Sequence, residues 1–348
     1  MSDGRAPAQR EHGWKGIVLA LATFLLVSKI PPLAAVTPVE DTMLLLLVAL
    51  GACFVAGWWE GGRLSLALIW AALATWWVLQ PGQPGAGAYQ DLARGWGLLI
   101  AGAFGVVCLS SSGRSFLDRA LPAVGIVLVV TLIVMAVSQG GSPQAQSVFA
   151  QQFAGRNSRW AANMQLAVQQ IGGQSPATSL KLSHLTTTYL QELDTYSAVM
   201  IQFYPAILAL ESLAGLAIAW GLYHRLSRAR LGPPLTRLRA LRFNDQLIWG
   251  LVVGLVLLLL PPFAPVASLG KNLLFFFGAL YALRGVGVGA WFVARWGAWA
   301  SFGVVVVALL LLPLALSTAL VFGISDTWID WRARAASASS HGRPGSSS

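Results

Sequence analysis

Long apolar stretches are the feature of this sequence that most limits its fold. A helix that crosses a bilayer needs about 20 mostly apolar residues. Nine segments come near that length, at residues 14–34, 43–59, 64–80, 95–112, 120–138, 197–223, 246–262, 271–294 and 299–323. Charged residues make up only 10% of the chain, whereas a soluble domain carries about 25%. The sequence therefore predicts an all-α, polytopic transmembrane helix bundle and excludes a soluble protein with a large core.

The number of spans depends on the segments 43–59 and 64–80, which are separated only by Glu60–Arg63 ("EGGR"). They form either a tight hairpin of two full spans or a re-entrant pair. We expect nine spans, with eight as the alternative count. The first apolar stretch follows a basic start but lacks a small-x-small cleavage site after a short core, so we expect a retained helix and not a signal peptide.

Positive charge sets the expected orientation, because cytoplasmic loops of membrane proteins collect Lys and Arg. The loop His224–Arg242 has six arginines and no acid, so we expect it to be cytoplasmic, like the amino terminus. The expected order is then a cytoplasmic tail at 1–13, spans one to five at 14–138, and spans six to nine at 197–323 with a basic cytoplasmic loop at 224–245. This predicts a multi-pass protein of the cell inner membrane whose carboxyl-terminal end is outside.

The basic loop has two interpretations. Its arginines are Arg225, Arg228, Arg230, Arg237, Arg239 and Arg242. They either fix the topology and contact anionic lipid headgroups, each contributing about 1 kcal/mol near the surface, or form a docking site for a cytoplasmic partner. The loop lacks interleaved aromatic residues, which argues against nucleic acid as that partner.

Residues 139–196 form a long polar insertion that follows five expected spans, so we expect it on the extracytoplasmic side. Its apolar residues recur at near-helical spacing, and Gly172–Pro176 ("GGQSP") interrupts them. The pattern predicts two amphipathic helices on the outer membrane face or over the bundle. This insertion is either a connector or a lid over a cavity. Residues 324–348 are expected to be a polar, largely disordered tail.

Two charged residues lie inside expected spans, Glu211 and Arg284. Each is about 14 residues from the outer end of its span, so at 1.5 Å per residue the two have similar depth. An unpaired charge at the bilayer centre costs several kcal/mol or more. We therefore expect Glu211 and Arg284 to form an intramembrane ion pair or to face one water-filled cavity. Such a pair either fixes helix packing or belongs to a substrate or proton site.

The Tyr204–Pro205 step predicts a kink in the sixth span, because proline removes a backbone hydrogen bond and clashes with the preceding turn. The kink would lie about a turn and a half before Glu211 and would open backbone carbonyls near its carboxylate. Tyr204 therefore joins the candidate binding residues, although such kinks also occur in ordinary helix bundles.

The stretch Arg284–Ala290 ("RGVGVGA") has the G-x-G-x-x-A spacing of a dinucleotide fingerprint. That motif needs a strand before it, and this copy lies inside an expected span. Gly278, Gly285 and Gly289 instead predict a helix face on which a neighbouring helix approaches closely.

No catalytic constellation is recognisable in the sequence. The four histidines are far apart, and Cys53 and Cys108 lie inside apolar stretches, where buried small hydrophobes are the better interpretation than a metal or redox site. We expect no cofactor and no metal.

Three stretches of the last third carry a resemblance: "RALRFNDQLIWGLVVGLVLLLLPP", "KNLLFFFGALYALRGVGVGAWFVARW" and "GISDTWIDWRAR". The last contains G-x-x-D-x-W-x-D-x-R through Gly323, Asp326, Trp328, Asp330 and Arg332. Together with the early "GWWEGGRLSLALIWAALA", they resemble the YybS-like family of bacterial predicted membrane proteins, a domain of unknown function. The resemblance implies a polytopic inner-membrane protein. Such families have been compared in fold with the substrate-binding subunits of energy-coupling-factor vitamin transporters, and fold alone does not establish function.

Three functional hypotheses follow. The first is a small-molecule-binding or transport subunit that uses Glu211, Arg284 and Tyr204 beneath an outer lid. The alternative is a structural or assembly protein that recruits a membrane or cytoplasmic protein partner through the basic loop. An intramembrane enzyme ranks third, because no catalytic residues support it.

Overall fold

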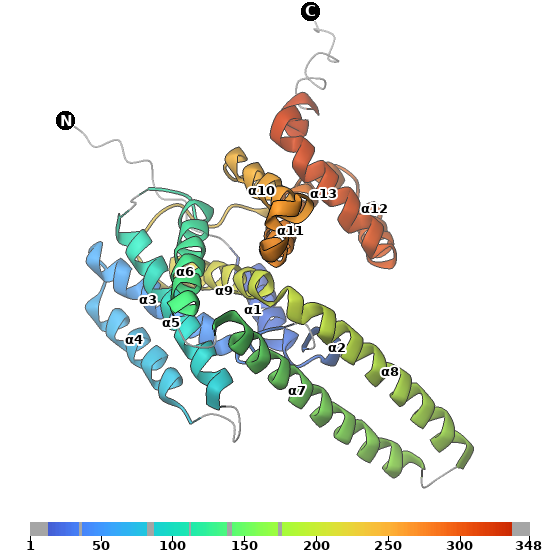
Figure 1. Ribbon diagram of the computed structural model, residues 1–348. Helices are drawn as coiled ribbons and strands as arrows, with labels where there is room; N and C mark the ends of the chain where they lie inside the picture. Colours follow the sequence, from blue (N-terminus) through green and yellow to red (C-terminus); the bar gives the residue numbers. More distant parts are fainter. Residues whose placement is uncertain are drawn as a thin grey trace, which may run out of the picture. The chain divides into compact units, whose positions relative to one another are not determined.

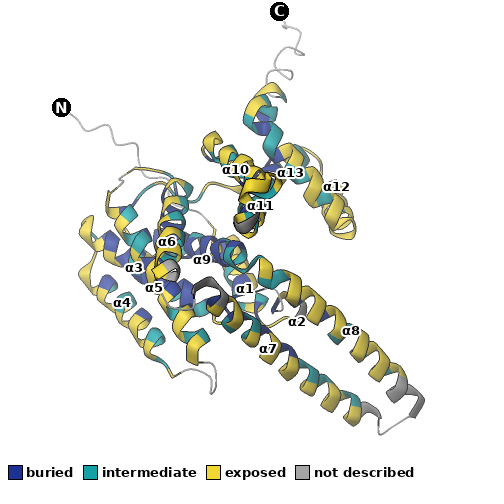
Figure 2. Cartoon of the chain, in the orientation of Figure 1, coloured by how far each residue is buried: buried dark blue, intermediate teal, exposed yellow. Residues whose placement is uncertain are grey.

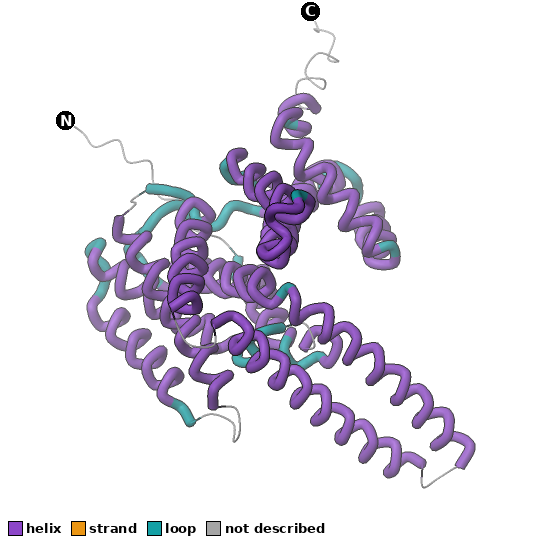
Figure 3. The backbone as a smooth tube through the Cα atoms, viewed as in Figure 1, coloured by secondary structure: helices purple, strands orange, loops and turns teal. Residues whose placement is uncertain are grey.

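The computed structural model describes residues 13–34, 37–81, 87–110, 113–137, 141–172 and 176–335. In these residues every regular element is a helix (Figure 3), which confirms the predicted all-α class. The chain divides into two compact units, residues 1–235 and 236–348, and each is described by itself. Residues 1–12 of the expected cytoplasmic tail and residues 336–348 of the expected polar tail lie outside the described residues.

Most helices follow one another through short connections (Figure 1), whereas the described loop at residues 227–247 contains only two 3-10 turns. The first unit contains α1 Lys15–Val27, α2 Pro31–Ala34, α3 Thr42–Trp59, α4 Leu64–Leu79, α5 Gly87–Ser110, α6 Leu117–Val137, α7 Gly141–Gly172, α8 Pro176–Gln202 and α9 Tyr204–Leu226. The second contains α10 Ile248–Leu259, α11 Ala267–Val293, α12 Ala298–Leu310 and α13 Leu312–Ile329, with 3-10 turns η1 Leu238–Ala240, η2 Asp245–Leu247 and η3 Pro261–Val266.

Six of the described helices are long and apolar enough to cross a membrane, namely α3, α5, α6, α9, α11 and α13. Shorter apolar helices lie at Lys15–Val27, Leu64–Leu79, Asp245–Leu259 and Trp299–Leu310. A helix of 13 residues is only about 20 Å long, less than the ~30 Å hydrocarbon core. The structure thus agrees with a multi-pass membrane protein, with six rather than nine helices of full spanning length.

Helix α3 is the centre of the first unit, where it packs against α4, α5 and α9. Figure 2 shows α3 and α9 mostly buried and α4 mostly exposed. Gly57 of α3 allows α9 to come close, because an added Cβ would overlap the hydroxyl of Tyr223. At the α3–α4 turn, Gly61 has φ +89°, a conformation that favours glycine. The turn fits a hairpin of two spans and a re-entrant pair alike, and α4, with 16 residues, is shorter than a full span, so the choice between the two stays a prediction.

The polar insertion consists of two helices, α7 and α8, which pack along each other as a hairpin (Figure 1). Helix α8 continues to Gln202, and a break at Phe203 (φ −106°, ψ 7°) separates it from α9. Pro205 therefore lies in the first turn of α9, where the missing N–H would have no partner in any case. The expected kink inside a span is replaced by the start of a new helix, so the sixth span begins at Tyr204 and not at 197.

In the second unit, α11 packs against α10 and α13. The α11–α13 contact is a close approach of two backbones. A Cβ added at Gly285 would overlap the carbonyl oxygen of Ala319, and one added at Gly323 would overlap that of Tyr281. Among the glycines expected to form a contact face, Gly285 does so, whereas Gly278 and Gly289 have open space around them.

The segment expected to be one span at 299–323 is two helices, α12 and α13, divided at Leu311 (φ −108°, ψ 41°). Arg295, after α11, and Arg332, after α13, line the same pocket, so the chain leaves that end of the unit and returns to it. Arg332 also donates to the backbone carbonyl of Arg239 at 3.0 Å. The carboxyl-terminal end of α13 thus lies on the side of the basic loop, and the expectation that it lies opposite is wrong.

Replacing Gly285 with Ala should destabilise the protein by about 1–3 kcal/mol, because the added methyl group forces two helix backbones apart. The matched control is Gly278→Ala on the same helix, which has room for the methyl group and should be neutral or stabilising by up to ~1 kcal/mol. Thermal unfolding of both full-length variants in detergent, followed by tryptophan fluorescence, measures the difference. Equal melting temperatures for the two variants would contradict the close α11–α13 contact.

Candidate functional site

Glu211 lies seven residues after the start of α9 and is buried, with 8% of the residue exposed. Its Oε2 accepts a hydrogen bond of 3.1 Å from the backbone N–H of Val39. Its Oε1 has no hydrogen-bond partner among the described residues. A buried acceptor without a partner costs free energy. This oxygen therefore marks a position where a donor from a solute would be stabilising.

The backbone that contacts Glu211 belongs to a short loop before α3. Tyr89 of α5 holds this loop by donating to the carbonyl of Pro38 and accepting from the backbone N–H of Glu40, both at 2.8 Å. Asp41 caps α3 by accepting from the N–H of Leu44. Because both sides of the loop are tied down, the Val39 N–H is held in a fixed position facing Glu211.

The α7–α8 hairpin attaches to the same loop through α7. Arg156 is buried and donates to the backbone carbonyls of Ala34 and Thr37. Gln152 donates to a Glu40 carboxylate oxygen at 3.1 Å, and Arg159 lies 3.6 Å from the same oxygen. Ala34 and residues 37–40 therefore lie between Glu211 and the base of the hairpin. We refer to Glu211, Val39, Glu40, Tyr89 and Arg156 as the Glu211 cluster.

Tyr204 joins the same region through aromatic contacts. Its ring stacks on Phe149 of α7 at a centroid distance of 4.7 Å. Phe149 also meets the ring of Tyr89 edge-on at 5.9 Å. Glu211 and Tyr204 are two of the three residues that the sequence predicted as a binding site. Both lie on α9, and Tyr204 contacts α7, the helix that carries Arg156 of the Glu211 cluster.

Arg284 has its own partners in the second unit. It is buried in α11, and its Nε donates to Asp326 Oδ2 at 2.9 Å while its Nη1 donates to Asp245 at 2.6 Å. Asp326 also accepts from Arg332 Nη2 at 3.0 Å. The side chain of Asp245 is 57% exposed, so this charge network, which we call the Arg284 network, reaches the polar end of α10. The predicted pair of Glu211 and Arg284 would join the two units. It stays a prediction, because each unit is described only by itself.

The arginines of the basic loop do not act as one group. Arg225 donates to the carbonyl of Gly221 at 2.8 Å and to that of Gly13 at 3.3 Å. Arg230 donates to the carbonyl of His224 at 2.7 Å. These two arginines therefore help to fold the loop end of the first unit.

The other four are more exposed. Arg228, Arg237 and Arg239 have exposed side chains, and Arg242 pairs with Asp330 at 2.8 Å. Burial raises the pKa of Asp330, but the N–H of Ala333 and the Arg242 guanidinium outweigh that effect and leave it below its ordinary value. Asp330 is therefore ionised at neutral pH.

Several residues of these networks were not predicted from the sequence. Asp326 was assigned to a polar tail because the preceding span was expected to end at 323. Arg156 was one charge in a polar insertion, and Tyr89 precedes the expected start of a span at 95. A carboxylate in the apolar stretch that continues to Ile329 was the available signal for Asp326. Arg156 and Tyr89 had no such signal, because their partners are backbone groups.

Cys53 and Cys108 are buried and free, as the apolar stretches around them suggested. No group of three His, Cys, Asp or Glu side chains that could hold a metal ion is found in the part of the chain that the structure describes.

Comparison with known proteins gives one family. The model of a family described as "Predicted membrane protein (DUF2232)" matches residues 111–327, which is more than half of the chain and includes Glu211, Arg284 and Asp326. No curated protein matches the chain, and no solved structure does. The match confirms the expectation of a membrane protein. It does not confirm the YybS-like family name, which remains a resemblance.

Replacing Asp326 with Ala should cost about 3–5 kcal/mol of stability, because it leaves Arg284 and Arg332 without their shared buried counter-ion. Asp330→Asn is the matched control, since it removes only the charge of an exposed partner of Arg242, whose contribution is about 0–1 kcal/mol, and asparagine tolerates the left-handed backbone at this position. Thermal unfolding in detergent measures both variants. If Asp326→Ala melts within a degree or two of Asp330→Asn, the Arg284 network does not stabilise the second unit.

Proposed function

Because the chain belongs to DUF2232, a family of predicted membrane proteins, we propose that it binds a small polar solute at the Glu211 cluster, as a solute-binding or transport subunit of the membrane. The observation that carries this proposal is the Glu211 carboxylate. It is buried in α9, with one oxygen bonded to Val39 and the other without a hydrogen-bond partner among the described residues. Intramembrane carboxylates with unmet hydrogen-bonding capacity are typical of solute and ion pathways.

The cluster offers both kinds of recognition. The free oxygen of Glu211 accepts hydrogen bonds, and the buried Nη2 of Arg156, also without a partner among the described residues, donates them. A solute with an amino or hydroxyl group and a separate acidic or carbonyl group fits this chemistry. Glu211 supplies the acceptor end of the site and Arg156 the donor end.

The α7–α8 hairpin is suited to act as a lid. Its attachment to Glu40 uses Gln152 and the half-exposed Arg159, and exposed ion pairs of this kind contribute little stability. Opening the hairpin would uncover the loop that holds Val39, but it would also break the buried hydrogen bonds of Arg156 to Ala34 and Thr37, so most of the free energy of opening comes from Arg156. We place this lid on the extracytoplasmic side of the inner membrane, with the amino terminus and the basic loop in the cytoplasm.

A second candidate function is the assembly role. It is favoured by the exposed arginines of the basic loop, Arg228, Arg237 and Arg239, which are free to meet an acidic surface of a cytoplasmic protein. Neutralising them would then abolish the function without altering solute binding at Glu211.

Glu211→Gln tests the first proposal, because it keeps the shape of the side chain but removes the charge. Full-length protein is purified in mild detergent, and released small molecules are identified by mass spectrometry. We expect a solute with the wild type and at least tenfold less with Glu211→Gln, since a hydrogen bond to a charged group contributes about 1.5–3 kcal/mol.

The matched control is Glu192→Gln on the exposed face of α8, which should retain the solute. Wild-type protein that carries no enriched small molecule, or Glu211→Gln protein that carries as much as the wild type, would contradict the proposal.

A further inference from the structure

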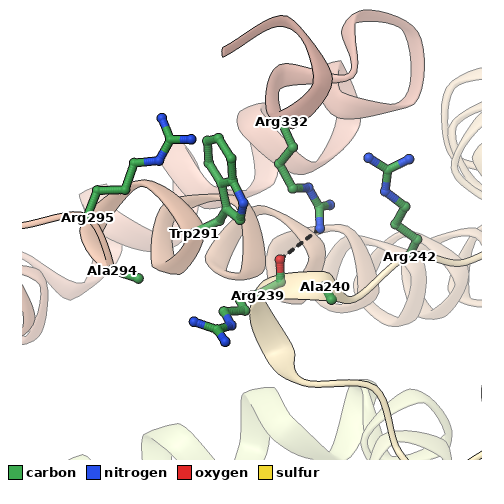
Figure 4. A pocket seen from close by; sticks show the side chains of 7 residues that line it. All are labelled: Arg239, Ala240, Arg242, Trp291, Ala294, Arg295 and Arg332. Atoms are coloured by element: carbon green, nitrogen blue, oxygen red, sulfur yellow. Dashed lines mark hydrogen bonds between the residues drawn. The ribbon is translucent and has the colours of Figure 1, made fainter. Parts of the chain in front are cut away.

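A pocket of about 500 Å³ lies in the second unit, between the end of α11, the η1 turn and the end of α13. Four arginines line it, Arg239, Arg242, Arg295 and Arg332, together with Trp291 (Figure 4). We call it the arginine pocket. Its volume lies within the ~300–1,000 Å³ that small-ligand sites occupy. Three segments far apart in the sequence thus contribute arginines to the lining of one pocket.

The four arginines differ in how far they are neutralised. Arg332 donates to Asp326, and Arg242 pairs with Asp330. Arg239 and Arg295 have no carboxylate partner among the described residues. The pocket therefore keeps positive charge that the protein itself does not compensate, and an anion is the complementary ligand.

Two of the arginines are held in place before a ligand arrives. The guanidinium of Arg295 lies 4.1 Å from the centroid of the Trp291 ring, a cation–π contact that orients it. Arg332 is buried and donates to the carbonyls of Arg239 and Leu241, and Figure 4 shows the first of these bonds. Fixed guanidinium groups lose little freedom when they form paired hydrogen bonds to phosphate oxygens.

The location of the pocket indicates where its ligand comes from. Helix α11 is a candidate span, and the pocket lies at its carboxyl-terminal end. Trp296 and Trp299 follow directly and are exposed, as is usual for tryptophans at the level of lipid headgroups. An anion therefore enters the pocket from the membrane surface.

From these observations we propose that the arginine pocket is a specific binding site for a phosphate ester. The phosphate oxygens accept from Arg239 and Arg295 and approach Arg242 and Arg332. The same chemistry is present in the headgroup of an anionic phospholipid and in a soluble phosphate monoester, and the two sources are separated by experiment.

The test uses full-length protein in mild detergent and native mass spectrometry. One arm titrates phosphatidylglycerol and the other titrates glycerol 3-phosphate. The double variant Arg239→Gln/Arg295→Gln removes the two uncompensated charges and leaves the Arg284 network intact. The matched control, Arg237→Gln/Lys271→Gln, removes two exposed charges of the same unit that do not line the pocket.

We expect the pocket variant to weaken phosphatidylglycerol binding roughly 30-fold, since each arginine near an anionic headgroup contributes about a fivefold factor, and the control to stay within about twofold of the wild type. Loss of glycerol 3-phosphate binding in the pocket variant alone would support the same site with a soluble ligand. Equal loss in both double variants, or no loss in either, would overturn the proposal, because binding would then follow total charge and not the pocket.

Discussion

The shared salt bridge of Asp326 is the interaction on which the second unit depends. One buried carboxylate accepts from Arg284 at 2.9 Å and from Arg332 at 3.0 Å, and so joins α11 to the end of α13. Inside a lipid-immersed bundle, charges persist only when they are paired or reach water. Because Arg332 also donates to the carbonyl of Arg239, the same charges hold the end of α13 against the basic loop. The arginine pocket is a consequence of this arrangement.

The fold class and most helix positions could be predicted from the sequence. Long apolar segments with few charged residues cannot cover a water-facing surface and therefore predict a membrane-embedded helix bundle. The break at Leu311 could not, since it lies in an unbroken apolar stretch with Pro313 as the only local signal. Missing that break changed the expected side of the carboxyl-terminal end. The boundary at Phe203 was missed for a related reason: Pro205 was interpreted as a kink within a helix, whereas it begins one.

The candidate sites were predicted only in part. Glu211 and Arg284 stood out because a charge in an apolar stretch is conspicuous, and both are buried and hydrogen-bonded. Their partners were not visible, because Val39 contributes a backbone N–H and Asp326 was separated from Arg284 by an expected span end. A single sequence shows which charges need partners, but the three-dimensional fold decides which groups supply them.

The most direct measurement is a proximity test of the end of α13 in native membranes. Ala240→Cys and Ala333→Cys, both at exposed positions, are joined by a short bifunctional maleimide. The control pair is Ala240→Cys with Ser268→Cys, which lies near the other end of α11, about 30 Å along that helix from Gly287, where the η1 turn packs. The structure predicts an efficient 240–333 cross-link and none between 240 and 268. A 240–268 cross-link without a 240–333 cross-link would contradict the return of α13 to the basic loop, and with it the Arg284 network and the arginine pocket.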